Sequence, residues 1–265
     1  MSAELRTGLV TGASAGIGAA VAHEMARLGW RIAIGARRVE RLQELATELR
    51  SLGAADVFAG SLDVGDADSV ENFFGKSEAA IGPSDVIVNN AGVSIPYRMH
   101  EYPVEQLRTE VETNVLGMLF VTRRALRALL ERELGGDIVF MSSDATNHPR
   151  PGQLVYGATK AAMENLATGL ARELEGTGVR VTKIRIGPTF SEFGSSWPTD
   201  PDEWAARSEW WGRFGLRDQR LKGVMLAAED VAKAALHAVT RPRGVWIDTI
   251  EIQPDAPVDR GDPAP

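Results

Sequence analysis

The sequence contains no cysteine among its 265 residues, so it can form no disulfide bond and offers no thiolate ligand to a metal. Its four histidines are scattered without the spacing of a metal site, and we expect no bound metal. Basic residues are not in excess either, because the formal net charge is −7 at pH 7. A chain without a basic surplus is a poor match for a phosphate backbone, and we expect no nucleic-acid partner.

Long apolar runs are absent as well. No uncharged apolar stretch approaches the length of a membrane span, and residues 1–6 lack the basic-then-apolar pattern of a signal peptide. Hydrophobic residues make up 44% of the chain and charged residues 25%, which is the balance of a soluble globular protein. We therefore expect a cytoplasmic protein without membrane contact, folded as a single domain over residues 1–265.

Short apolar segments alternate along the chain with segments of helical pattern. The segments that we interpret as strands are 7–11, 31–36, 57–62, 85–92, 137–143, 179–186 and 245–252. The expected helices are 19–28, 39–52, 66–80, 103–132, 152–175 and 229–240. This alternation predicts right-handed βαβ crossovers and hence an α/β fold built on a parallel sheet.

A glycine-rich turn follows the first expected strand and precedes the first expected helix. This order of elements places backbone N–H groups and a helix N-terminus against a pyrophosphate, and the glycines let the backbone approach it. The residues that we predict to contact a dinucleotide here are Gly12, Ser14, Ala15, Gly16, Ile17 and Gly18. The alternative is that the glycines serve only a left-handed turn or close packing.

The end of the second expected strand indicates which dinucleotide binds. An acidic residue at this position would bind the ribose of NAD, but the chain reads Ala36-Arg37-Arg38. Two guanidinium groups without a carboxylate suit a 2′-phosphate. We therefore predict NADP(H) rather than NAD(H), with Arg37 as the main contact. The alternative is that both arginines are solvated.

Polar residues stand at the carboxyl ends of two further strands, where open α/β sheets bind ligands. Asp63, followed by Val64, ends the third strand, and Asn90, followed by Ala91 and Gly92, ends the fourth. Asp and Asn also commonly cap the helix or turn that follows. For Asn90 we favour a cofactor contact, and we include all five residues in the predicted cofactor site.

The stretch 137–160 carries the strongest sign of chemistry. Tyr156 and Lys160 are four residues apart on an expected helix, so they share one face and the ammonium can lie beneath the phenol. The charge would lower the pKa of the phenol towards the working pH. Ser142 and Ser143 end the preceding strand and face opposite ways, and we predict that Ser143 points into the cleft. The alternative is an ordinary surface tyrosine and lysine.

Two features of the long helices need an explanation. Asn114 and Gly117 interrupt the helical pattern of 103–132, which suggests a local break with a functional use, unless Asn114 is simply tolerated there. The helix after Tyr156 is rich in small residues, which permit a close approach of another helix in a subunit interface or within the monomer. These small residues are Ala158, Ala161, Ala162 and Gly169.

The segment 190–222 is long and aromatic, and the chain ends in a tail at 254–265. We interpret the segment as a lid over a substrate cleft, because long insertions in compact domains tend to be functional. A helical core segment is the alternative. The aromatic residues of segment 190–222 favour an apolar or aromatic substrate. They are Trp197, Trp204, Trp210, Trp211 and Phe214. Its acidic residues, which are either solvated or favourable to a cationic substrate, are Glu192, Asp200, Asp202 and Glu203.

Taken together, these residues resemble the short-chain dehydrogenase/reductase family over nearly the whole chain. The resemblance rests on Thr11-Gly12-x-x-x-Gly16-x-Gly18, Asn89-Asn90-Ala91-Gly92, Asn114, Ser143 and Tyr156-x-x-x-Lys160. It implies a single Rossmann-type domain with a seven-stranded parallel sheet flanked by helices on both faces. It also implies a nicotinamide cofactor and a homotetramer or homodimer whose interfaces use the two long helices.

The resemblance also implies roles for single residues. Tyr156 would donate the proton, Ser143 would steady the oxyanion, and Lys160 would also hold the nicotinamide ribose. Asn114 would position a water that relays protons to Lys160.

The chain departs from the family after its sixth strand, where a threonine usually contacts the cofactor carboxamide. Gly187 aligns with the family glycine and Ser191 falls at the threonine position, but Thr189 is an alternative partner.

These observations predict a reversible NADP(H)-dependent oxidoreductase that interconverts a carbonyl and an alcohol on a small-molecule substrate. Two other functions stay open. One is an epimerase or dehydratase that uses the bound nicotinamide transiently, and the other is a non-catalytic NADP-binding sensor or scaffold.

Overall fold

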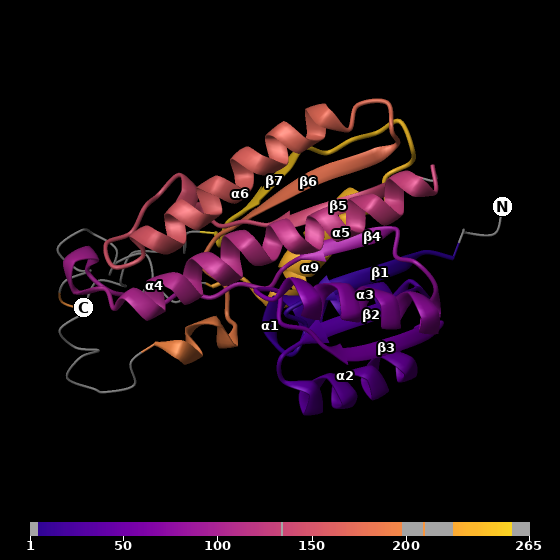
Figure 1. The fold of residues 1–265 in the computed structure, drawn as a ribbon, viewed down its shortest axis with the longest axis horizontal. Helices are drawn as coiled ribbons and strands as arrows, with labels where there is room; N and C mark the ends of the chain where they lie inside the picture. The colour runs from indigo at the N-terminus through magenta and orange to yellow at the C-terminus, as the bar shows by residue number, and fades with distance from the viewer. Residues whose placement is uncertain (1–4, 134, 198–208, 210–224, 256–265) are drawn as a thin grey trace, which may run out of the picture.

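The computed structural model of the protein describes residues 5–133, 135–197, 209 and 225–255. Within them, seven strands form one parallel sheet in the order β3-β2-β1-β4-β5-β6-β7 (Figure 1). The strands are β1 (Thr7–Thr11), β2 (Arg31–Ala36), β3 (Asp56–Ser61), β4 (Val86–Asn89), β5 (Gly136–Met141), β6 (Val179–Ile186) and β7 (Thr249–Ile252). The expected α/β fold with a seven-stranded parallel sheet is confirmed.

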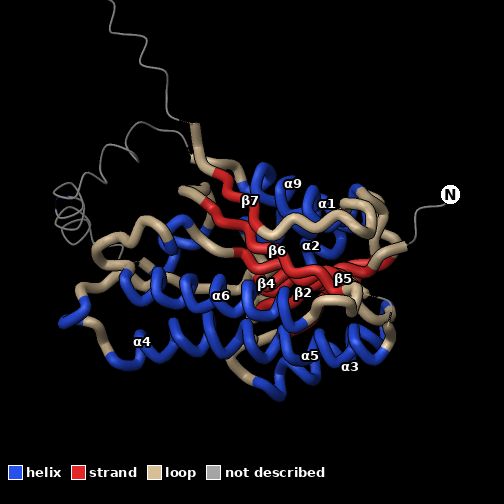
Figure 2. Tube along the Cα trace, turned by 90° about the horizontal axis from the view of Figure 1, so that it is seen from above, coloured by secondary structure: helices blue, strands red, loops and turns tan. Residues whose placement is uncertain are grey.

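Helices cover both faces of the sheet (Figure 2). One face is covered by α1 (Gly16–Arg27), α2 (Val39–Ser51) and α9 (Ala228–Val239). The other face is covered by α3 (Ala67–Ile81), α5 (Gly117–Glu131) and α6 (Leu154–Glu173), and α4 (Val104–Val111) precedes α5. Shorter helical turns are η1 (Met99–Glu101), η2 (Glu112–Leu116), η3 (Asp144–Thr146) and η4 (Glu192–Ser196). Among the described helices, none is both long and apolar enough to cross a bilayer.

The central strands explain why the sheet is sandwiched in this way. Every residue of β1, β4 and β5 is buried, as expected for parallel strands that are covered on both sides. The chain runs from β1 outwards through β2 and β3, and then returns to place β4 on the other side of β1. The strand order therefore reverses between β1 and β4. In open α/β sheets a ligand binds outside the carboxyl ends of the strands at such a point.

Several boundaries differ from the sequence prediction, among them the end of the fourth strand, which lies at Asn89 rather than at 92. The last strand begins at Thr249 rather than at 245, because side chains of β6 bind the carbonyls of the preceding residues. Arg180 donates to Val245 O at 2.7 Å and Thr182 donates to Ile247 O at 2.7 Å. The predicted break in the long helix is confirmed, since the π-helical turn η2 separates α4 from α5.

A buried ion-pair network joins the amino ends of four strands, at the sheet edge opposite the carboxyl ends. Asp137 on β5 accepts from Arg6 Nη2 at 2.6 Å and from Arg180 Nε at 2.7 Å. Arg6 also donates to Asp85 Oδ1 at 2.7 Å. The side chain of Asp137 is 4% exposed, so removing it would take a buried carboxylate away from two partly buried guanidinium groups and leave Arg6 paired with Asp85.

We predict that Asp137→Ala lowers the free energy of unfolding by about 3–5 kcal/mol, because it removes a buried carboxylate that two partly buried guanidinium groups share. Urea denaturation measures the change. Arg127→Ala is the matched control, since its guanidinium is 56% exposed and lies 3.4 Å from Glu71. The control should change the free energy of unfolding by less than about 1 kcal/mol. Equal losses in the two variants would contradict this account of the network.

Candidate functional site

The glycine turn after β1 is shaped by the close approach of the segment after β4. Gly12 and Gly16 have φ angles of +66° and +58°, in the left-handed region that favours glycine. A Cβ on Gly12 would lie 2.8 Å from Ala91 Cα, and one on Gly18 would lie 2.5 Å from Asn90 Nδ2. Helix α1 begins here without a side-chain cap, so its first N–H groups face the turn.

Asn90 and Asp63 both hold the backbone at strand ends. Asn90 Nδ2 donates to Thr11 O at 2.9 Å and to Gly12 O at 3.2 Å, so this side chain fastens the glycine turn to the end of β4. Asp63 Oδ1 accepts from Gly65 N at 3.0 Å. The cap of α3 is Asp66 rather than Asp63. A cofactor contact by Asn90, Asp63 or their neighbours stays a prediction.

A cluster of charged side chains lies beside the glycine turn. Arg38 donates to Ser14 Oγ from Nε at 3.2 Å and from Nη2 at 3.0 Å, and from Nη1 to Glu192 Oε2 at 2.9 Å. Arg41 Nη1 donates to both carboxylate oxygens of Glu192, at 2.7 Å and 2.6 Å. The structure thus brings Arg38, Arg41 and Ser14 together around one carboxylate. We name these three residues the anion pocket.

The anion pocket differs in two residues from the sequence prediction. Arg37 is exposed and has no part in this cluster, although the sequence made it the main contact. Arg41 was missed, and the signal for it was its position one helical turn after Arg38 on α2. Glu192 is exposed to solvent, but its carboxylate is paired with two arginines and is therefore not free for a cationic substrate.

Tyr156 and Lys160 lie on the first two turns of α6, and both are buried. The Nζ atom of Lys160 is 5.7 Å from the centroid of the Tyr156 ring and donates to Met141 O at 2.7 Å. The predicted shared face is therefore present. The ammonium is held against the last residue of β5.

The two ionisable groups are shifted mainly by burial. Burial raises the pKa of Tyr156 to about 12, and hydrogen bonding with Ser143 acts in the opposite direction. Burial lowers the pKa of Lys160 to about 8. We expected the Lys160 charge to bring the pKa of Tyr156 below its ordinary value, and the structure shows the reverse direction. At neutral pH Tyr156 is thus a protonated phenol, the form that can donate a proton.

The two serines after β5 have different partners, as strand parity predicts. Ser142 Oγ donates to Glu164 Oε1 at 2.7 Å, one helical turn beyond Lys160 on α6. Ser143 Oγ accepts from Ala145 N at 3.2 Å and acts through a hydrogen bond on the pKa of Tyr156. Ser143 is therefore the serine that the fold places with Tyr156.

Asn114 lies in the π-helical turn η2 and is fully buried. Its Oδ1 accepts from Val93 N at 2.8 Å, and its Nδ2 donates to Val93 O at 2.8 Å and to Thr159 Oγ1 at 3.1 Å. A Cβ on Gly92 would lie 3.3 Å from Asn114 Oδ1 and 3.6 Å from Lys160 Nζ. The side chains of Asn114 on η2 and Lys160 on α6 thus lie on the same side of Gly92. The water relay between them stays a prediction.

The segment after β6 returns the chain to the glycine turn. Thr189 Oγ1 donates to Gly187 O at 2.9 Å within its own turn. A Cβ on Gly16 would lie 3.1 Å from Ser191 Cβ, so Ser191 is the hydroxyl that borders the turn. A Cβ on Gly187 would lie 2.2 Å from Gln253 Oε1 and 3.0 Å from Pro254 Cδ, so a side chain there would have to displace the exposed end of Gln253.

The described part of the expected lid, residues 190–197, lies against the site. Figure 1 shows η4 as the orange helical turn that follows β6. The rings of Phe193 and Tyr156 have centroids 5.3 Å apart, and Trp197 Nε1 donates to Ser94 O at 2.9 Å. The other residues on which the lid prediction rests lie outside the described residues: Trp204, Trp210, Trp211, Phe214, Asp200, Asp202 and Glu203. The tail beyond 255 also lies outside them.

Sequence reasoning missed a buried ion pair beside the phenol. Arg150 and Asp144 form a two-pronged contact, with Nη1 and Oδ1 3.0 Å apart, and their side chains are 12% and 5% exposed. Asp144 acts to raise the pKa of Tyr156 and Arg150 acts to lower it. Nothing in the spacing of these two loop residues points to a pair, because the loop conformation brings them together.

We predict that Lys160→Met raises the free energy of unfolding by about 2 kcal/mol at about pH 7. The folded-state pKa of Lys160 lies below its ordinary value, so the charged form costs stability at pH values below about 8. That cost fades as the pH rises from about 8 towards 10.5. Urea denaturation at about pH 7 and about pH 9.5 should therefore show a gain that shrinks at the higher pH. A variant that is less stable than the parent at about pH 7 would contradict a net cost of burial.

Comparisons with known proteins agree with this geometry. The family model described as short chain dehydrogenase matches residues 6–202. Sulfoacetaldehyde reductase 2 of Chromohalobacter salexigens is 34% identical over 247 residues, which are 93% of either chain. The NADP-dependent 3-hydroxy acid dehydrogenase of Salmonella typhi is 34% identical, with 93% of this chain and 94% of the relative covered. The closed form of serine dehydrogenase complexed with NADP+ has a TM-score of 0.80 and 31% identity, and 97% of both chains is covered. The chain therefore belongs to the short-chain dehydrogenase/reductase family of oxidoreductases.

Proposed function

We propose that this protein catalyses the reversible, NADP(H)-dependent interconversion of a carbonyl compound and an alcohol. The observation that carries the proposal is the buried group of Ser143, Tyr156 and Lys160 at the carboxyl end of β5, next to the glycine turn of β1. A protonated phenol beside a serine hydroxyl is suited to protonate the oxygen of a bound carbonyl. The relatives support the reaction class, since their names describe reductases and dehydrogenases.

The residues around the glycine turn fit an NADP(H) molecule. Left-handed glycines and the uncapped start of α1 can receive a pyrophosphate, and the anion pocket already holds a carboxylate. We propose that Arg38 and Arg41, rather than Arg37, bind the 2′-phosphate, and that Ser191 rather than Thr189 contacts the carboxamide. A relative named as NADP-dependent and a serine dehydrogenase complexed with NADP+ support this choice of cofactor. When bound, NADPH supplies the hydride.

The chain's own residues would manage the proton. Tyr156 donates it, because burial keeps the phenol protonated at neutral pH. Ser143 holds the oxygen that receives it. Lys160 carries a positive charge up to about pH 8, and Asn114 presents its Oδ1 on the same side of Gly92 as the ammonium. These positions support a path for protons from Tyr156 through Lys160 towards Asn114.

The substrate would meet Phe193 as well as Tyr156, because these two rings are in contact. This contact supports an apolar or aromatic group next to the reacting carbon. The names of the relatives point to sulfoacetaldehyde, serine and 3-hydroxy acids, and these compounds belong in the assay beside larger aldehydes and ketones. An epimerase or dehydratase is the competing function, and it would produce no net change in NADPH absorbance.

We predict that Tyr156→Phe lowers kcat for NADPH-dependent reduction by about 10²–10⁴-fold, because the phenol is the proton donor. NADPH oxidation over the carbonyl panel measures the loss. Two matched variants separate a catalytic hydroxyl from a structural one. Ser143→Ala should lose activity, whereas Ser142→Ala should keep it, since the Ser142 hydroxyl is bonded to Glu164. Wild-type turnover in Tyr156→Phe on a substrate of the parent would contradict the assignment.

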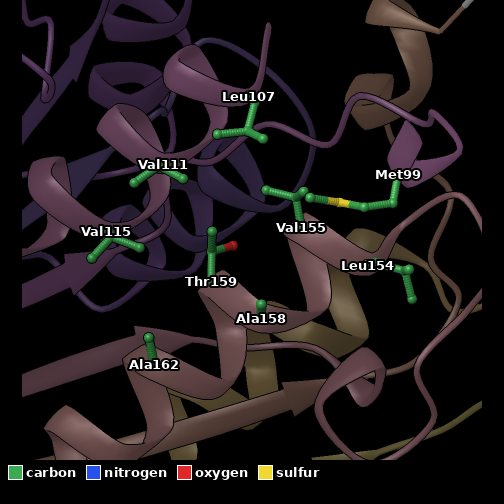
Figure 3. Close-up of a pocket in the computed structure, with 9 residues that line it drawn as sticks. All are labelled: Met99, Leu107, Val111, Val115, Leu154, Val155, Ala158, Thr159 and Ala162. Carbon is green, nitrogen blue, oxygen red and sulfur yellow. The ribbon is translucent and has the colours of Figure 1, made fainter. Parts of the chain in front are cut away.

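We also propose that the protein assembles as a homo-oligomer through α4 and α6. An apolar hollow of about 450 Å³ lies between these helices, and no predicted catalytic residue lines it (Figure 3). Ala158 and Ala162 line it and are exposed in the single chain, and a Cβ on Gly169 would meet nothing within 4 Å. The small residues of α6 thus leave room for another helix, which supports an interface between copies rather than packing within the monomer.

We predict that Ala162→Arg shifts the protein to a smaller assembly, because a guanidinium on this face blocks the approach of a second helix. Size-exclusion chromatography with light scattering measures the mass. Gln43→Arg, on the exposed face of α2, is the control and should keep the parent mass. A parent protein that is monomeric, or an unchanged mass in Ala162→Arg, would refute the interface.

A further inference from the structure

The carboxylate of Glu192 fills the anion pocket. It accepts hydrogen bonds from Arg38 and Arg41, and Arg38 is also bonded to Ser14 in the glycine turn. These contacts join η4, which follows β6, to α2 and to the turn after β1. The pocket is therefore already occupied by an anion that belongs to the protein itself.

We propose that Glu192 competes with the 2′-phosphate of the cofactor for Arg38 and Arg41, and so limits the preference of the enzyme for NADP(H) over NAD(H). The inference deepens the proposed function and rests on its cofactor assignment. It adds a specificity-determining residue that lies 151 positions from Arg41 in the sequence and contributes no ligand to the cofactor when NADP(H) is bound.

Competition follows from the chemistry of the two anions. A carboxylate and a phosphate both accept paired N–H groups from a guanidinium, so they use the same donors of Arg38 and Arg41. Hydrogen bonds from these arginines lower the pKa of Glu192, which is therefore ionised at neutral pH. Two anions in one pocket repel each other, and the carboxylate has to leave before the phosphate binds both arginines.

The geometry also makes the exchange feasible. The side chains of Glu192 and Arg38 are each 47% exposed and that of Arg41 is 46% exposed, so water can replace the contacts as they break. Exposed ion pairs of this kind contribute little to stability. NAD(H) would meet the pocket differently, because its 2′-hydroxyl can donate to the Glu192 carboxylate. That is the role of the acidic residue which NAD-binding enzymes place after β2 and which this chain lacks at Ala36.

The experiment compares two adenosine fragments that differ in the 2′-phosphate. Isothermal titration calorimetry of adenosine 2′,5′-bisphosphate and of adenosine 5′-monophosphate is performed on the parent and on Glu192→Gln. We expect the variant to bind the bisphosphate about two- to tenfold more tightly and the monophosphate no more tightly than the parent does. The Kd of NADH divided by the Kd of NADPH should also be higher in the variant than in the parent. Unchanged or weaker binding of the bisphosphate would overturn the inference.

Two controls separate exchange at the pocket from a general effect of charge. Glu44→Gln removes a carboxylate that acts on Arg41 through its charge and not through a hydrogen bond. An equal gain in this variant would overturn the inference. In an Arg38→Ala, Arg41→Ala background, Glu192→Gln should have no further effect on bisphosphate binding, because the contested donors are gone. A gain that persists there would also overturn it.

Failure of the inference can be told apart from failure of the proposed function. Fragment binding can be measured without turnover. If the protein reduces none of the carbonyls, but Glu192→Gln binds the bisphosphate more tightly than the parent does, the proposed function is wrong and the inference is supported. If the protein is active but Glu192→Gln leaves its affinity for the bisphosphate unchanged, the proposed function is supported and the inference is wrong. Thermal melting of each variant, read beside the titrations, confirms that folded protein is compared.

Discussion

The hydrogen bond from Lys160 Nζ to Met141 O holds the candidate site together. It ties α6 to the last residue of β5 over 2.7 Å, and the buried ammonium needs such an acceptor because burying an unpaired charge is costly. The bond acts together with the apolar face of α6, whose Met163, Ala167 and Leu170 pack into the core over β5 and β6. Since Ser143 follows Met141 by two residues and Tyr156 precedes Lys160 by one helical turn, the same contact brings the serine and the phenol together.

The site and the opposite edge of the sheet treat buried charge in opposite ways. At the amino ends of the strands, Asp137 is neutralised by Arg6 and Arg180, and the network joins four strands. At the carboxyl ends, the acceptor of the Lys160 ammonium is the carbonyl of Met141, and burial raises the pKa of Tyr156. The shifted ionisation states of Tyr156 and Lys160 therefore lie at the carboxyl ends of the strands, where a reaction can use them.

The segment 190–197 connects the two ends of the proposed cofactor site. Glu192 reaches the anion pocket, Ser191 borders Gly16 in the glycine turn, and Phe193 contacts the ring of Tyr156. Three consecutive residues therefore lie against the anion pocket, the glycine turn and Tyr156, which come from different elements of the fold. A change at one of these contacts acts on the others through a short and continuous backbone.

The sequence by itself determined the order of the elements, the glycine turn and the shared face of Tyr156 and Lys160, because spacing and periodicity act within one element. Strand parity likewise separated Ser143 from its neighbour. Only the tertiary structure decided which arginines form the anion pocket. Glu192 meets Arg41 across 151 positions, because the crossover from β6 returns the chain to the glycine turn. No local pattern encodes such a contact, since it depends on how separate elements pack.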